Sequence, residues 1–323
     1  MVNSDKSNLI ISDSKGAWFR ATILFILALI GTVGMWSVVV FIPDIEKEFG
    51  LDRGTSSLLY AFTMIGFGFG TVVIGKVYDK FGIKKPILLA TFVLITSYYF
   101  YSIFPFYWQF LILQFFMGFA ASAFFGPAMA DISNFFNKQR GFALSIVASA
   151  NYVAGATWPL LIGYFLTFIE WRAAHFWISI CLFIMIPLIL LLKNASVDES
   201  KSHDMKQRYK DIRLDLSNNQ IQVLLMLAGI CCCVAMAMPQ VHMVALCVDN
   251  GFGLQVGTEI LAVMLYSGMI SRIVFGMISD RIGPVLSLLL GSFLQMVSLT
   301  FFLPFSSEIS LYVVSLMFGL SQA

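Results

Sequence analysis

Long apolar runs constrain this chain more than any other feature of its sequence. A helix needs roughly 20 apolar residues to cross the hydrocarbon core of a bilayer. The hydrophobic share is 59% and the charged share 12%, whereas soluble domains have about 45–50% and about 25%. The sequence therefore predicts an all-α polytopic membrane protein. The runs lie near residues 18–42, 56–78, 86–104, 107–131, 140–168, 173–192, 221–247, 257–279 and 284–305, and a tenth begins near Ile309 and is cut off at Ala323.

Two loops of the chain repeat the same pattern. The first copy starts at Gly75 and the second at Gly276, and both read glycine, three residues, aspartate, a cation, one residue, glycine. The copies lie 201 positions apart, and at the same offset Phe116-Met117-Gly118 matches Met317-Phe318-Gly319. A fixed offset of this kind indicates an internal structural repeat. We therefore expect two related halves joined in tandem.

Positive charge is distributed unequally between the loops. With a cytoplasmic N-terminus, sixteen of the twenty lysines and arginines lie on the cytoplasmic side, and Lys47, Arg53 and Arg172 lie on the other. Cytoplasmic loops carry the excess of lysine and arginine in membrane proteins. We therefore expect a multi-pass protein of the cytoplasmic (inner) membrane with its N-terminus in the cytoplasm.

A polar segment divides the chain near its middle. Residues 193–219 have mixed charges and few large apolar side chains, which is typical of a solvated linker. The predicted organisation is an N-terminal six-helix bundle at 1–192, a cytoplasmic linker at 193–219, and a partial C-terminal bundle of about four helices at 220–323.

Arg272 is the one cation that lies deep inside an apolar run and belongs to the loops of neither side. It lies eight residues before Asp280, which places it roughly 12 Å from the cytoplasmic end of its helix. A charge at that depth costs at least ~2.5–3.5 kcal/mol, so it should face a cavity or an acid. The acids of the sequence fall at the ends of the runs, and a guanidinium matches a carboxylate with two parallel hydrogen bonds. A substrate-binding role is one interpretation, and a gating or helix-packing arginine is the other.

Several other side chains are candidates for the same region. Asn151 lies roughly 17 Å from the start of its helix near Arg140, close to the middle of the bilayer. A buried amide needs partners, so Asn151 is either a hydrogen bond between helices or a contact to substrate. Gln240 is a second candidate amide. The remaining candidates are aromatic wall residues, and they are Trp36, Tyr60, Tyr152 and Tyr266.

The repeated loop resembles a known family. The first copy is similar to the signature loop between the second and third helices of the major facilitator superfamily, and the second copy to its counterpart. The segments Pro43–Gly50, Phe135–Ala143 and Arg272–Gly276 resemble, within that superfamily, the monocarboxylate porter and oxalate:formate antiporter group. The resemblance implies two pseudo-symmetric six-helix bundles, with about ten of twelve helices in this sequence, and substrate bound between them.

The resemblance also implies a conformational-switch role for the loop residues and for two residues near the fifth run. We expect Asp79 to lie at a helix N-terminus or against a cation such as Arg140. The switch residues are Gly75, Asp79, Lys80, Gly82, Lys84, Lys85, Asp131, Arg140, Gly276, Asp280, Arg281 and Gly283.

The sequence departs from the animal monocarboxylate porters at one position. Those proteins have an aspartate one turn before the arginine of the eighth helix, where this chain has Gly268. The departure argues against proton coupling through that aspartate, and it leaves anion binding by Arg272 unaffected.

The predicted function is secondary transport of small organic anions, mono- or dicarboxylates, by alternating access. The alternatives are an exporter of drugs or other neutral solutes, in which Arg272 serves gating, and an inactive fragment of a longer transporter, since the 201-residue offset predicts counterparts out to about position 393. Motifs of zinc hydrolases, nucleophile-elbow hydrolases and phosphate-binding loops are absent from the sequence, so we expect no enzyme. We expect a monomer in the lipid bilayer with an anionic substrate, a proton or a counter-anion as coupled ion, and no cofactor, metal or nucleic acid.

Overall fold

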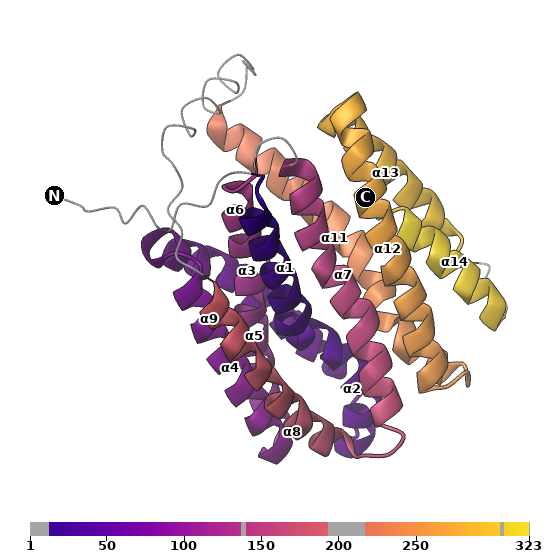
Figure 1. Ribbon diagram of the computed structural model, residues 1–323. Helices are drawn as coiled ribbons and strands as arrows, with labels where there is room; N and C mark the ends of the chain where they lie inside the picture. Colours follow the sequence, from indigo (N-terminus) through magenta and orange to yellow (C-terminus); the bar gives the residue numbers. More distant parts are fainter. Residues whose placement is uncertain (1–12, 137–139, 193–216, 304–306, 323) are drawn as a thin grey trace.

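The computed structural model describes residues 13–136, 140–192, 217–303 and 307–322 (Figure 1). Every regular element among them is helical. The side chains of Arg140 and Asp280 and most of the expected linker, residues 193–216, lie outside the described part of the chain.

The first six apolar runs form the helices from α1 to α9. The first run is one long span that is divided at Thr32, whose hydroxyl donates to the Ala28 carbonyl at 2.7 Å. The fourth run is divided near Gly126, because Pro127 at the start of α6 has no N–H to continue the preceding helix. The elements are α1 (Lys15–Gly31), α2 (Val33–Phe49), α3 (Arg53–Phe81), α4 (Lys84–Ile103), α5 (Tyr107–Ala121), η2 (Ser122–Phe124), α6 (Gly126–Ser133), α7 (Arg140–Phe165), α8 (Trp171–Cys181), η3 (Leu182–Ile184) and α9 (Met185–Leu191).

The last four runs form α11 (Asn218–Asp249), α12 (Leu254–Ile282), α13 (Pro284–Thr300) and α14 (Glu308–Leu320). Eight spans in the described residues are long and apolar enough to cross a membrane, and Val285–Thr300 and Glu308–Leu320 are shorter apolar helices. The prediction of an all-helical chain built on ten apolar runs is thus confirmed.

The two copies of the repeated loop end their helices in the same way. Gly82 follows α3 with φ of 72°, and Gly283 follows α12 with φ of 87°. Residues other than glycine rarely adopt a positive φ. The glycines therefore allow the sharp reversal into α4 and α13, and they lie at the 201-residue offset.

Helix packing repeats at the same offset. A methyl group at Gly118 of α5 would overlap the Thr63 carbonyl of α3, and one at Gly319 of α14 would overlap the Met264 carbonyl of α12. Glycine lets two helix backbones approach this closely. The pairs α3–α5 and α12–α14 are therefore equivalent contacts, and the internal repeat of the sequence is also a repeat of the structure.

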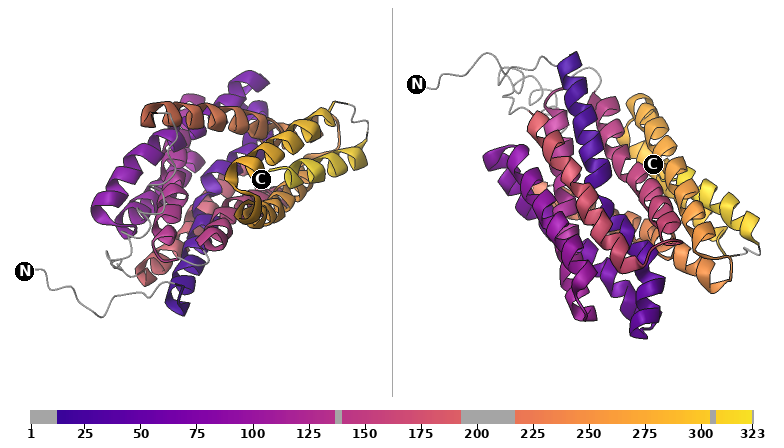
Figure 2. Two further views of the ribbon diagram at one scale, coloured as in Figure 1. Left: turned by 90° about the horizontal axis from the view of Figure 1, so that it is seen from above. Right: turned by 60° about the horizontal axis from the view of Figure 1, so that its bottom comes forward.

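The helix α12 lies between α7 on one side and α14 on the other (Figures 1 and 2). Along the α7–α12 contact, Gly163 faces Thr258 toward one end and Gly276 faces Ser145 toward the other. Between them the hydroxyls of Thr157 and Tyr266 lie 3.0 Å apart. This packing joins the first six spans to the last four along most of the length of α12.

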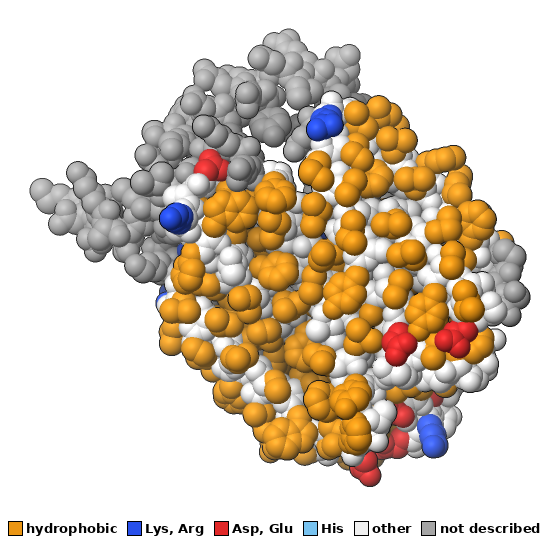
Figure 3. Space-filling model, turned by 45° about the vertical axis from the view of Figure 1, so that its right-hand side comes forward, with side chains coloured by type: hydrophobic (Ala, Val, Ile, Leu, Met, Phe, Trp, Pro, Cys, Tyr) orange, Lys and Arg blue, Asp and Glu red, His pale blue; other side chains and the backbone are white. Residues whose placement is uncertain are grey.

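The face that carries the last helices is largely apolar. Figure 3 shows hydrophobic side chains over most of it, with the charged side chains that are drawn toward its upper and lower parts. Many of these side chains are exposed, among them Leu288, Leu289 and Phe293 of α13. Such a surface is typical of contact with lipid or with other apolar helices.

A buried ion pair joins α1 to α6. The Arg20 guanidinium donates to both carboxylate oxygens of Asp131, from Nε at 2.6 Å and from Nη2 at 2.9 Å, and the two side chains are 4% and 8% exposed. The guanidinium also lies 4.8 Å from the centre of the Phe135 ring. Asp131, one of the predicted switch residues, therefore forms a buried ion pair within the first six spans.

We predict that Asp131→Asn strongly destabilises the protein, by about 3–5 kcal/mol, because it removes the buried carboxylate charge that the Arg20 guanidinium binds. Thermal unfolding of the purified protein in detergent measures the loss. Glu48→Gln is the matched control, since Glu48 pairs with Arg172 at a half-exposed site, where an ion pair contributes ~0.2–1 kcal/mol. Equal losses in the two variants would contradict the prediction.

Candidate functional site

Arg272 of α12 lies against Tyr152 of α7, at the contact between the first six spans and the last four. Its Nη2 donates to the Tyr152 hydroxyl at 3.1 Å, and its guanidinium carbon lies 4.2 Å from the centre of the Tyr152 ring. Its Nε is buried without a hydrogen-bond partner in the described structure. The guanidinium is thus held by one phenol and retains an unused donor.

Arg272 has no acidic partner among the described residues. The ion pairs there involve Arg20, Arg53 and Arg172. A cation–π contact is attractive by about 0.5–2 kcal/mol, depending on how dry the site is. Tyr152 therefore provides part of the stabilisation that a carboxylate would otherwise supply.

Gly268 explains how Tyr152 reaches this position. The residue lies one turn before Arg272 on α12, and a methyl group there would lie only 2.5 and 2.7 Å from Cε1 and Cδ1 of the Tyr152 ring. A residue with a side chain at 268 would clash with Tyr152 in this position. Because position 268 is glycine and not aspartate, the Tyr152 ring has room to lie beside Arg272.

Two glutamines form a buried pair next to this cluster. Nε2 of Gln240, on α11, donates to Oε1 of Gln322 at 2.9 Å, and the residues are 6% and 0% exposed. Oε1 of Gln322 lies 3.3 Å from the place of a methyl group on Gly268. Gln240 was a predicted candidate, and Gln322 was missed, although an amide inside the tenth apolar run was a visible signal of the same kind as Asn151.

Asn151 and Trp36 bond to each other. The indole Nε1 of Trp36 donates to Oδ1 of Asn151 at 3.0 Å, and the indole lies on Gly155, where a methyl group would meet the ring. Asn151 and Tyr152 are neighbours on α7, so they face different helices: Asn151 contacts α2 and Tyr152 contacts α12. Asn151 thus forms a hydrogen bond between two helices, which is one of the two roles considered for it from the sequence.

The helix α11 contributes a sulphur atom beside Tyr152. The Tyr152 hydroxyl lies 3.4 Å from the Met236 sulphur, and the candidate Tyr60 lies on α3, partly buried. Tyr266 lies farther along α12 and contacts Thr157. An aromatic ring therefore lies beside Arg272, a sulphur atom lies beside that ring, and the Gln240–Gln322 pair lies next to them.

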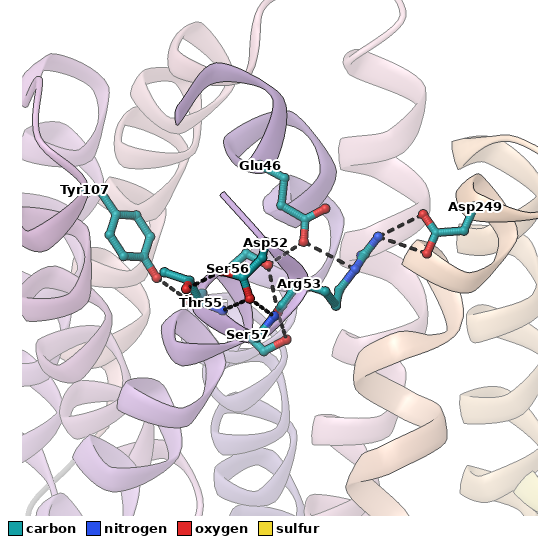
Figure 4. A network of polar contacts seen from close by, with 9 residues as sticks. Glu46, Asp52, Arg53, Thr55, Ser56, Ser57, Tyr107 and Asp249 are labelled. Atoms are coloured by element: carbon teal, nitrogen blue, oxygen red, sulfur yellow. Dashed lines mark hydrogen bonds and ion pairs between the residues drawn. The ribbon is translucent and has the colours of Figure 1, made fainter. Parts of the chain in front are cut away.

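A polar network closes one end of the molecule between α3 and α11 (Figure 4). Nη2 of Arg53 donates to both oxygens of Asp249, at 2.8 and 3.0 Å, and its Nε lies 3.3 Å from Glu46. The Ser56 hydroxyl donates to Glu46. Asp52 caps α3, and hydrogen bonds from Thr55 lower the pKa of its carboxyl below the usual value. We call this side of the molecule the Arg53 end.

The residues predicted to form a conformational switch lie at the opposite end, which we call the Lys80 end. The ammonium groups of Lys80 and Lys85 lie 5.3 and 4.6 Å from the centre of the Phe81 ring, and Lys84 donates to the Leu190 carbonyl at 3.4 Å. Arg281 lies in the last turn of α12. Gly75 and Asp79 belong to the last turns of α3. The expected contact of Asp79 with Arg140 involves a side chain outside the described part of the structure.

A groove of about 970 Å³ lies between α11 and α13, and its wall is mostly apolar. His242 and Leu299 in this wall correspond, at the 201-residue offset, to Phe41 and Tyr98. Those two rings lie 4.1 and 5.7 Å from the ring of His175 on α8. The equivalent place in the first half is filled by α8, which carries His175. We therefore do not assign the substrate site to this groove. No group of three or more metal-ligating side chains gathers among the described residues.

Comparison with known proteins places this architecture in a family. The model of the Major Facilitator Superfamily matches residues 24–323. The chain is 27% identical to the MFS-type transporter pynF of Aspergillus niger over 66% of this chain and 49% of that protein. It is 25% identical to the MFS-type transporter pytF of Aspergillus terreus over 66% and 72%, and 24% identical to the agnestins efflux protein AgnL12 of Paecilomyces divaricatus over 76% and 56%.

These matches span about half to three quarters of the relatives' own lengths. The names of the three relatives are those of transporters and of an efflux protein, and none names a carboxylate porter, so the finer resemblance to the monocarboxylate and oxalate:formate group is not what they show. The family match covers nearly the whole chain and agrees with the helical spans and the repeated glycine contacts. The chain is a multi-pass membrane protein that belongs to the major facilitator superfamily of transporters.

Proposed function

We propose that the chain is a secondary transporter that exports small, largely apolar organic molecules. The observation that carries this proposal is the setting of Arg272, whose guanidinium lies 4.2 Å from the centre of the Tyr152 ring, with the Met236 sulphur 3.4 Å from the Tyr152 hydroxyl. Sulphur and aromatic rings suit flat apolar ligands. The agnestins efflux protein is named as an exporter, which supports the same direction.

In this proposal Arg272 is a gating residue. Its guanidinium binds the ring and the hydroxyl of Tyr152, so it ties α7 to α12 at mid-span. Rocking of the first six spans against the last four would make and break this contact in each cycle. We also propose residues 1–192 and 220–323 as the two moving bodies, and the Lys80 end, where the cations gather, as the cytoplasmic side.

Transport of small organic anions is the second candidate. It is favoured by one observation: Arg272 has no acidic partner among the described residues and keeps an unused Nε donor. A carboxylate could accept from that donor and displace the Tyr152 hydroxyl. The two candidate functions predict different effects of an Arg272 substitution on the transport of neutral and of anionic substrates.

We predict that Arg272→Gln lowers transport of a neutral and of an anionic probe by the same factor, roughly threefold to tenfold, because it removes a contact of ~1 kcal/mol between α7 and α12. Uptake of Nile red and of radiolabelled benzoate into everted membrane vesicles, driven by an imposed ion gradient, measures both. Arg172→Gln is the control, since Arg172 bonds to Glu48 and to the Phe104 carbonyl within the first six spans.

Selective loss of benzoate uptake in Arg272→Gln, with Nile red uptake unchanged, would favour the organic-anion candidate. Transport of neither probe by the wild-type protein would contradict the proposed export of apolar molecules.

The Arg53–Asp249 pair is the proposed latch of the Arg53 end. The pair is part-exposed, with side chains 33% and 58% accessible, and such pairs contribute about 0.2–1 kcal/mol. A contact of that size can hold one state closed and still release in each cycle, because 1 kcal/mol changes a population ratio about fivefold.

We predict that Asp249→Asn increases the population in which the Arg53 end is open, by up to about fivefold. Pulsed electron paramagnetic resonance between spin labels at Lys47→Cys and Gln255→Cys, in a background with the five native cysteines replaced by serine, measures that distance distribution. The exchanged pair Arg53→Asp with Asp249→Arg should restore the closed distance, and Glu48→Gln should leave it unchanged. An identical distribution in wild type and Asp249→Asn would refute the latch.

A further inference from the structure

The end of α3 and the start of α4 gather several lysines around one acid. The lysines are Lys76, Lys80, Lys84 and Lys85, and the acid is Asp79. Three of the lysines are exposed, and Lys84 is partly exposed. None of them forms an ion pair with another described residue. This part of the Lys80 end therefore carries an excess of positive charge that the described protein does not neutralise.

An exposed aromatic ring holds two of these lysines close together. The ammonium groups of Lys80, on α3, and Lys85, on α4, lie 5.3 and 4.6 Å from the centre of the Phe81 ring, and the ring itself is exposed. Each cation is attracted by the ring, while the two like charges repel each other over a short distance. An anion bound beside the ring would be attracted by both.

A third lysine extends the positive surface toward α9. Nζ of Lys84 donates to the carbonyl of Leu190, near the end of α9, at 3.4 Å, and an ammonium group has three N–H donors. Lys84 and Lys85 are neighbours in the first turn of α4, so their side chains leave the helix in different directions. We call Lys80, Phe81, Lys84 and Lys85 the lysine rim, which reaches from the end of α3 across the start of α4 to the end of α9.

An apolar wall begins next to the lysine rim. The following turns of α4 expose Leu88, Leu89 and Phe92, and the end of α9 exposes Leu190. The two helices lie side by side (Figure 1). Phe92 lies two turns from Lys85 on the same side of α4, roughly 10 Å farther along the helix axis. Cations at the end of an exposed apolar wall fit an amphiphile with an anionic head and an apolar tail.

The turn between α3 and α4 does not require all of these lysines. At the 201-residue offset, Lys84 and Lys85 correspond to Val285 and Leu286, which are apolar and exposed. The second copy of the loop makes the same reversal, through Gly283 with positive φ. Because the turn forms without lysines at these two positions, the lysine rim calls for a role other than folding of the turn.

We propose that the lysine rim binds the headgroup of an anionic phospholipid whose acyl chains lie along α4 and α9. The phosphodiester accepts hydrogen bonds from the ammonium groups of Lys84 and Lys85, and Lys80, held by the Phe81 ring, adds a third positive charge. A phospholipid fits better than a soluble anion, because it also covers the apolar wall. The assignment is an interaction with the membrane and does not depend on what the protein transports.

Native mass spectrometry of the full chain, released from detergent micelles, measures the affinity for the first bound lipid. The two probes share their acyl chains and are palmitoyl-oleoyl phosphatidylglycerol, which is anionic, and palmitoyl-oleoyl phosphatidylcholine, which is zwitterionic. We expect the wild-type protein to prefer phosphatidylglycerol. Lys84→Gln/Lys85→Gln should weaken phosphatidylglycerol binding about fivefold to twentyfold and leave phosphatidylcholine binding unchanged, because lysines beside a lipid surface attract anionic headgroups by about this factor.

Lys15→Gln/Arg281→Gln is the matched control. Both residues are exposed at the Lys80 end, one at the start of α1 and the other in the last turn of α12. The control therefore loses the same charge at the same end of the molecule but outside the lysine rim, and it should bind phosphatidylglycerol as the wild type does. Circular dichroism of each variant verifies that its helices are intact.

Equal affinities of the wild-type protein for the two lipids would overturn the lipid site. An equal loss of phosphatidylglycerol binding in the two double variants would overturn it as well, since the attraction would then follow net charge and not the lysine rim. An excess of sn-glycerol 3-phosphate tests the soluble anion. It should leave phosphatidylglycerol bound, and displacement of the lipid would replace the phospholipid assignment by a site for a free phosphate.

Discussion

The hydrocarbon core of a bilayer offers no hydrogen-bond partners, and the whole structure follows from that constraint. Each backbone group must be satisfied within its own segment, so every described span is helical. The same constraint acts on side chains. Arg20 is buried and paired with Asp131, Trp36 is paired with Asn151, and Gln240 is paired with Gln322. At Arg272 the pairing is incomplete, because its Nε is buried without a hydrogen-bond partner among the described residues.

The region around Arg272 shows how one small residue can change the chemistry of a site. Gly268 leaves room for the Tyr152 ring, and the ring then faces the guanidinium with both its π surface and its hydroxyl. The contact between α7 and α12 at this level is therefore a cation–π contact with a hydrogen bond and not an ion pair. In the proposed transport cycle, a contact of this kind would let α7 and α12 separate at a smaller free-energy cost than a buried ion pair would require.

Much of the fold could be predicted from the sequence. Apolar run length located the ten helical segments, and the repeated glycines at 82 and 283 marked the reversals, because only glycine readily adopts positive φ. The candidate site was predicted in part. Arg272, Tyr152 and Gln240 lie in or beside one cluster, but Asn151 bonds to Trp36 instead, and Gln322 was missed. The expected preference for carboxylates rested on Arg272, on the scarcity of acids to pair with it and on the family resemblance, and it stays a prediction; the contact of Arg272 with the Tyr152 ring came only from the structure.

The sequence by itself determined the class of protein, the number of spans and the relation between the two halves, because hydrophobic length and a 201-residue offset are linear properties of the chain. Only the tertiary structure decided which side chains meet. The partners of Arg20 and Arg53 lie 111 and 196 residues away in sequence, and Tyr152 reaches Arg272 across 120 residues. Such pairs depend on the rotation and depth of each helix relative to its neighbours, which are set by close packing at positions such as Gly118, Gly268 and Gly319 and not by the local sequence of any one helix.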